Sequence, residues 1–320
     1  MTRRSQLRLA LVAVAACAAP HVVTYAQRFQ SRALGVRVDV LVTEDKQPVT
    51  GFKPEDFELR DEGVVQHVTA LDVERIPLNV VLAFDTSSSV AGVRLASLLA
   101  AARALVSSLH EVDRTALVTF SSRVRLLAPL TPSRLQIVSA LERVSASGRT
   151  ALRDAAFTAL SLPGADRGRT LVLIFSDGAD TASWLTDEKV IEAAKATDAV
   201  VYPVRVHRTM TITRGGDAVV KDKHGFLISP LEPPSTQAIN LDSRDTFVAD
   251  LAAETGGRVM YADGDHDLRT AFRNILDEFR NRYVLSYTPM GVSSIGWHRL
   301  EVKLRGKKGK VIARRGYFAG

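Results

Sequence analysis

The sequence predicts an α/β fold in which a doubly wound, mostly parallel sheet is inserted between β segments from the two ends of the chain. Between residues 77 and 284, apolar runs alternate with helical stretches, which is typical of parallel strands covered by helices on both faces. Residues 27–76 and 285–320 show the two-residue alternation of strands. Because the N-terminal strands alone make too small a sheet for independent stability, we expect the two ends to pair as a small β-sandwich.

The composition is that of an ordinary globular protein. Of the 320 residues, 46% are hydrophobic and 24% are charged, which excludes a mainly disordered or collagen-like chain. The one long apolar run, Leu9 to Ala19, is shorter than the ~18 residues that would indicate a membrane-spanning helix. We therefore expect no transmembrane helix.

Residues 1–26 are predicted to be an export signal. Basic residues without any acidic residue precede the apolar run, and the first acidic residue of the chain is Asp39. Small residues before Gln27 suit cleavage after Ala26. These features predict an exported protein, either periplasmic or secreted.

Two alternatives concern the same signal. Val14–Cys17 resembles a bacterial lipobox, in which case a lipid anchor at Cys17 would hold the protein at a membrane as a lipoprotein. Thr2–Arg8 also resembles a twin-arginine signal. Cys17 is the only cysteine, so a chain cleaved after Ala26 forms no disulfide and depends on packing for its stability.

The two end segments are predicted from alternation and turns. At the N-terminal end, strands are expected from Val36 onward and around Phe57–Leu59 and Val64–Leu71. At the C-terminal end, the apolar residues on either side of Gly306–Gly309 indicate a β-hairpin with a basic turn. An exported protein meets little DNA, so this basic stretch does not predict nucleic-acid binding.

The central segment, 77–284, is expected to contain alternating elements. The predicted strands are 80–84, 116–120, 171–175, 200–206 and 258–261, and the predicted helices are 92–109, 133–144, 151–160, 186–196, 243–254 and 266–282.

An insertion at 208–242 interrupts this alternation, because such connections usually need only ~2–6 residues. Its sequence suggests a small hairpin of 218–220 with 226–228, and both an ordered functional loop and a disordered loop fit the pattern. Its start follows a strand's carboxyl end, so its basic residues are candidate partner contacts. These are Arg208, Arg214, Lys221 and Lys223.

A constellation of oxygen ligands is predicted at the carboxyl ends of the parallel strands, where such sheets bind ligands. Asp85, Ser87 and Ser89 follow the first strand, and Thr150 and Asp177 are expected at two other strand ends. Carboxylate and hydroxyl oxygens suit a hard cation such as Mg²⁺. A turn followed by a helix N-cap would use the same residue types at 85–89.

The Asp-x-Ser-x-Ser motif between a strand and a helix resembles the von Willebrand factor type A family, which includes the ligand-binding domains of integrins. The resemblance covers about residues 77–284 in element order. It implies a metal-ion-dependent adhesion site that holds Mg²⁺, or alternatively Ca²⁺ or Mn²⁺. The implied ligands are Asp85, Ser87, Ser89, Thr150 and Asp177. The flanking segments resemble those of exported bacterial proteins that carry such a domain.

One position departs from this resemblance. Similar sequences often have Gly-Gly-Thr in the threonine loop, whereas this chain has Arg149 between Gly148 and Thr150. If the position needs a positive φ, Arg149 would be strained and Thr150 would be the least secure ligand. Arg149 is also a candidate partner contact.

The expected function is that of a non-enzymatic binding module with no catalytic residues. Two carboxylates at most cancel the charge of a divalent cation, so an open coordination position would attract an exposed Asp or Glu of a protein partner. The histidines include no HxxxH pair and the chain has no Gly-x-Ser-x-Gly elbow. A metal-assisted hydrolase and a purely structural envelope protein are the alternatives.

Overall fold

The computed structural model describes residues 35–70, 76–162, 168–177, 180–206, 246–262 and 267–319, together with the strands 209–214, 220–221, 227–228 and 235–240. The export signal predicted at 1–26 and the lipobox cysteine lie outside these residues. Among the described residues, no helix has the length and apolar character needed to cross a membrane.

The central sheet is doubly wound and mostly parallel, as predicted. Its strand order is β15-β10-β9-β6-β7-β8, and only β8 runs antiparallel to its neighbour. The strands are β6 (Leu78–Asp85), β7 (Arg114–Phe120), β8 (Val124–Thr131), β9 (Arg169–Phe175), β10 (Val200–Val206) and β15 (Met260–Ala262). All residues of β6 are buried, which places this strand at the centre of the domain.

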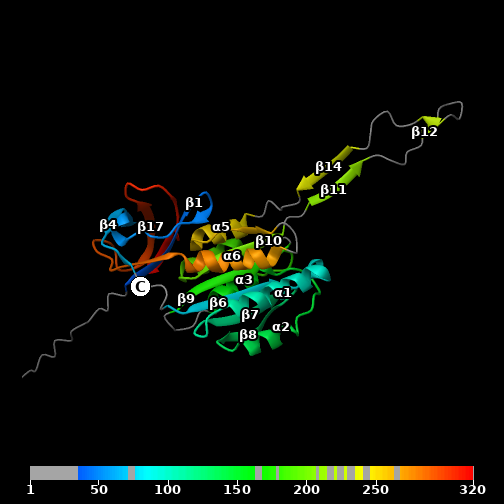
Figure 1. Cartoon of the computed structure of the whole chain (residues 1–320), viewed down its shortest axis with the longest axis horizontal. Helices are drawn as coiled ribbons and strands as arrows, with labels where there is room; N and C mark the ends of the chain where they lie inside the picture. Colours follow the sequence, from blue (N-terminus) through cyan, green and yellow to red (C-terminus); the bar gives the residue numbers. More distant parts are fainter. Residues whose placement is uncertain are drawn as a thin grey trace, which may run out of the picture. The chain divides into compact units, whose positions relative to one another are not determined.

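Helices cover both faces of this sheet (Figure 1). Val80, Leu82 and Phe84 of β6 share one core with helices α1, α2 and α6, and Val81 and Ala83 share the other with α3, α4 and α5. Because successive side chains of a strand point to opposite faces of the sheet, β6 contributes to both cores. The helices are α1 (Val93–Ser108), α2 (Arg134–Leu141), α3 (Leu152–Ser161), α4 (Asp187–Lys195), α5 (Phe247–Thr255) and α6 (Leu268–Arg280).

The insertion contains antiparallel pairs. β11 (Thr209–Arg214) pairs with β14 (Ser235–Asn240), and β12 (Val220–Lys221) pairs with β13 (Leu227–Ile228). The second pair matches the small hairpin predicted from the sequence. Of the predicted partner contacts, Arg208 and Lys223 lie outside the described residues, as do the side chains of Arg214 and Lys221.

The two ends of the chain pair as a sandwich of two sheets, as expected. One sheet has the order β18-β1-β16-β5, with β2 also on β1, and the other has the order β19-β17-β3-β4. The N-terminal strands are β1 (Val36–Glu44), β2 (Gln47–Pro48), β3 (Phe57–Asp61), β4 (Val64–Gln66) and β5 (Thr69–Ala70), with the short 3-10 helix η1 (Pro54–Asp56) before β3. The C-terminal strands are β16 (Tyr283–Tyr287), β17 (Gly296–Leu304), β18 (Lys310–Ile312) and β19 (Gly316–Ala319).

The predicted hairpin around Gly306–Gly309 is wrong. β17 pairs with β3 and β19, whereas β18 pairs with β1 in the other sheet. The basic turn is therefore a crossing between the two sheets. Local alternation predicted both strands correctly but could not assign their partners, because β3 and β1 lie more than two hundred residues earlier in the chain.

The strand pairing makes a prediction about fragments. A fragment of residues 27–75 lacks β16, β17 and β18, so β1 and β3 lose their long antiparallel partners. We expect this fragment to be unfolded by circular dichroism and to show no cooperative urea transition, whereas residues 77–284 should unfold cooperatively. A cooperative transition of the 27–75 fragment would contradict this account of the sandwich.

Candidate metal site

Backbone hydrogen bonds fix the loop after β6 against its neighbours. The Thr86 N–H donates to the Phe120 carbonyl oxygen at 2.7 Å, at the end of β7. The Ser147 N–H donates to the Thr86 carbonyl oxygen at 2.8 Å, and the Ser88 N–H donates to the Gly148 carbonyl oxygen at 3.0 Å. The motif loop and the threonine loop are therefore held together by their main chains.

Asp85 ends β6, all of whose residues are buried, and is itself fully buried. One carboxylate oxygen accepts from the Ser87 N–H at 2.8 Å and the other accepts from the Ser176 hydroxyl at 2.8 Å. Burial raises the pKa of this carboxyl group. Within the described part of the chain, the hydrogen-bond partners of Asp85 are neutral, so a bound cation would compensate its charge.

Ser87, Ser89 and Asp177 form a continuous row of oxygen atoms. The two serine Oγ atoms are 3.0 Å apart, and the Ser89 hydroxyl donates to Asp177 Oδ1 at 2.8 Å. Octahedral Mg²⁺ with ligand distances of about 2.0–2.1 Å brings neighbouring ligand oxygens to about 3 Å from each other. The spacing and the hard-oxygen chemistry of these side chains fit such an ion.

Thr150 does not follow a strand, contrary to the prediction, because the helix α2 comes between β8 and its loop. It lies in the loop between α2 and α3 and is buried. Its carbonyl oxygen accepts from the N–H groups of Thr181 and Ala182 at 2.8 and 2.9 Å, and its own N–H donates to the Thr181 hydroxyl at 3.0 Å. The hydrogen bonds described here fix the main chain of Thr150, not its hydroxyl. Its role as a ligand stays a prediction.

Arg149 does not have the backbone strain that a positive φ would cause. Gly148 carries the positive φ of this loop, +83°, and Arg149 is not among the described non-glycine residues with positive φ. The Arg149 N–H donates to the Ser122 hydroxyl at 2.9 Å, and its guanidinium donates to the Thr181 carbonyl oxygen. The arginine therefore braces the loop that carries Thr150.

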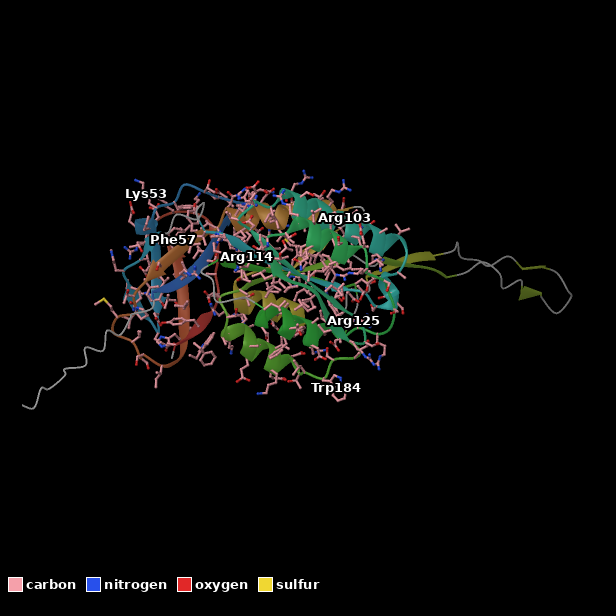
Figure 2. The ribbon with its side chains drawn as sticks, turned by 90° about the horizontal axis from the view of Figure 1, so that it is seen from below. Lys53, Phe57, Arg103, Arg114, Arg125 and Trp184 are labelled. Atoms are coloured by element: carbon pink, nitrogen blue, oxygen red, sulfur yellow. The ribbon has the colours of Figure 1, made fainter. Side chains whose placement is uncertain are left out.

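Three residues of this region were not identified from the sequence. Ser176 donates to Asp85, as described above, and Arg94 on α1 forms an ion pair with Asp177. Trp184, labelled in Figure 2, is 93% exposed. Its main-chain N–H donates to both carboxylate oxygens of Asp154 at 3.1 Å. In the sequence, Trp184 follows small and polar residues outside the predicted strands and helices. A tryptophan in such a segment is a signal of a binding residue that the sequence analysis could have used.

In the part of the chain that the structure describes, carboxylates, histidines and cysteines do not form a rival site. Among the described residues, no group of three or more such side chains is arranged to hold a metal ion. The row at Asp85 differs from such clusters, because hydroxyl groups supply part of its donor set. The buried His298 is not near this row. It lies in β17 of the sandwich, where its Nδ1 is 2.9 Å from Asp61 Oδ1.

The family model of the von Willebrand factor type A domain matches residues 80–179, a segment that contains all five predicted ligands. No curated protein gives a significant match to the sequence.

Several solved structures are similar. An aerotolerance-related membrane protein from Bacteroides fragilis NCTC 9343, with multiple mutations to serines, is 18% identical over 63% of this chain and 98% of that chain, with a TM-score of 0.45. Proximal thread matrix protein 1 from the mussel byssus, with a zinc-occupied MIDAS motif, is 15% identical over 68% and 49%, with a TM-score of 0.49. The vWF domain of the pili tip protein Mfa5 from Porphyromonas gingivalis is 14% identical over 63% and 94%, with a TM-score of 0.39.

Proposed function

Since residues 80–179 form a von Willebrand factor type A domain, a protein-interaction module, we propose that this domain captures a protein partner through a divalent cation. The proposed ligands are Asp85, Ser87, Ser89, Thr150 and Asp177, and the preferred ion is Mg²⁺, with Ca²⁺ or Mn²⁺ as alternatives. The single observation that carries the proposal is the row of Ser87, Ser89 and Asp177 oxygens at 3.0 and 2.8 Å.

The charges of these ligands define the chemistry of the partner. The carboxylates of Asp85 and Asp177 at most balance a divalent cation, and the hydroxyl ligands add no charge. Arg94, which is paired with Asp177, adds a positive charge beside them. A coordination position open to solvent therefore favours an anionic group over water. An exposed Asp or Glu of another protein supplies such a group, and this partner class is our proposal.

The rim of the site offers a surface for the rest of such a partner. The loop of Trp184 is tied to the loop of Thr150 through Thr181, and Arg149 contacts the same loop. Exposed Trp and Arg are the residue types that most often dominate binding at protein interfaces. We propose that the module is non-catalytic and acts outside the cytoplasm, in the periplasm, as a secreted protein or as a lipoprotein anchored at Cys17.

The metal site is tested by Asp85→Ala. With Mg²⁺ at a hundredfold excess over its dissociation constant, the parent protein should gain about 2.7 kcal/mol of unfolding free energy, and the variant should gain none. Urea denaturation with Mg²⁺ or EDTA measures this gain. Glu192→Ala, which removes an exposed carboxylate, is the matched control and should behave like the parent. Equal gains in the parent and Asp85→Ala would refute the site.

The remaining proposed ligands should rank below Asp85. Asp177→Ala should weaken Mg²⁺ binding, and Thr150→Ala should weaken it less.

A pull-down from an envelope extract tests the partner. A true protein partner should be retained by the parent with Mg²⁺, released by EDTA and not retained by Asp85→Ala.

A further inference from the structure

Arg94 places a fixed positive charge against the proposed metal site. It is the second residue of α1, and its guanidinium forms an ion pair with Asp177 Oδ2. The same group donates to the Ser89 carbonyl oxygen at 3.3 Å. The Arg94 side chain is 24% exposed and that of Asp177 is 0% exposed, so this ion pair is largely screened from water.

We propose that Arg94 is a built-in counter-ion that competes with the divalent cation for Asp177 and so sets the metal affinity of the site. This inference rests on the proposed function, in which Asp177 is a metal ligand. The two carboxylate oxygens of Asp177 have different partners. Oδ1 accepts from the hydroxyl of Ser89, a proposed metal ligand, and Oδ2 contacts Arg94.

The charge of Arg94 has two effects on the site: it stabilises Asp177 in the metal-free protein, and it weakens the binding of a divalent cation. A buried carboxylate without a compensating charge is costly, and the guanidinium stabilises Asp177 when no metal is bound. Arginine does not lose its proton in proteins, so its charge persists when a divalent cation approaches. The two cations then repel each other across one carboxylate.

The test compares Arg94→Gln, which removes the charge, with Arg94→Lys, which keeps it. Isothermal titration with Mg²⁺ and with Mn²⁺ should show binding on the order of tenfold tighter for Arg94→Gln than for the parent, and Arg94→Lys should remain close to the parent. Arg103→Gln is the control, because it removes an arginine charge farther along α1 (Figure 2). This variant should bind Mg²⁺ with the same affinity as the parent.

A second measurement does not depend on the affinity. In EDTA, Arg94→Gln should melt at a lower temperature than the parent because Asp177 loses its counter-ion, and saturating Mg²⁺ should close this gap. If the parent binds Mg²⁺ and Arg94→Gln binds equally or more weakly, the inference fails and the proposed function stands. If neither protein binds Mg²⁺ or Mn²⁺, both fail.

Discussion

Asp61→Ala is expected to lower the free energy of unfolding by about 3–5 kcal/mol, the usual cost of removing one member of a buried charged network. Asp61 is fully buried at the end of β3. One of its oxygens accepts from the hydroxyls of Tyr287 and Tyr317, both at 2.8 Å, and the other is 2.9 Å from His298 Nδ1. Tyr287 lies in one sheet of the sandwich and the other three residues lie in the opposite sheet.

The size of the effect follows from what the substitution leaves behind. Two hydroxyls and an imidazole would remain buried without their shared acceptor, and a low-polarity interior makes such groups costly. Burial raises the pKa of Tyr317 to about 12 and raises that of Tyr287 as well, so both phenols stay donors at neutral pH.

Urea denaturation measures this effect, and Asp198→Ala is the control. Asp198 forms an ion pair with Arg37 at 3.2 Å but is 63% exposed, so its removal should cost only about 0–1 kcal/mol. A loss below about 1 kcal/mol for Asp61→Ala would mean that water replaces the carboxylate and that the network does not hold the two sheets together.

The sequence predicts the central domain well because its signals are local. Strands β6, β7, β9 and β10 contain apolar runs whose described apolar residues are buried on both faces, and each run is recognisable without knowledge of its neighbours. β8 was not predicted, because it is an edge strand with a partly exposed pattern. The partners of β17 and β18 were missed for a different reason, since they depend on contacts across nearly the whole chain.

The same distinction applies to the functional residues. The Asp-x-Ser-x-Ser motif is visible because Asp85, Ser87 and Ser89 are close together in the sequence, and Asp177 is visible because it comes shortly after the end of β9. Arg94 looks like an ordinary surface residue of a helix, and its contact with Asp177 spans 83 positions. Asp61 stands beside Glu62 and Gly63, where its residue type is typical of a turn, whereas its side chain is buried in the sandwich core and accepts from the Tyr287 hydroxyl.

The packing of α5 against the sandwich is equally invisible in the sequence. The C-cap of α5 is Gly256, whose φ of +77° gives the left-handed conformation common at helix ends. A Cβ atom added at Gly256 would lie 2.5 Å from the Arg314 nitrogen and 2.7 Å from the Ala313 carbonyl carbon, both main-chain atoms. The Arg315 N–H also donates to the Glu254 carbonyl oxygen at 3.3 Å. The end of this helix therefore touches the chain between β18 and β19 directly.

Gly256→Ala should consequently cost more than the left-handed conformation alone explains. Gly63 has a matching φ of +81° but nothing within 4 Å of an added Cβ, so Gly63→Ala should cost only about 1–2 kcal/mol. Gly256→Ala adds overlap with a main chain that cannot rotate away, and we expect a total of about 2–5 kcal/mol by urea denaturation. Equal losses for the two variants would show that the sandwich yields at this contact, so that α5 and the C-terminal strands are not rigidly joined.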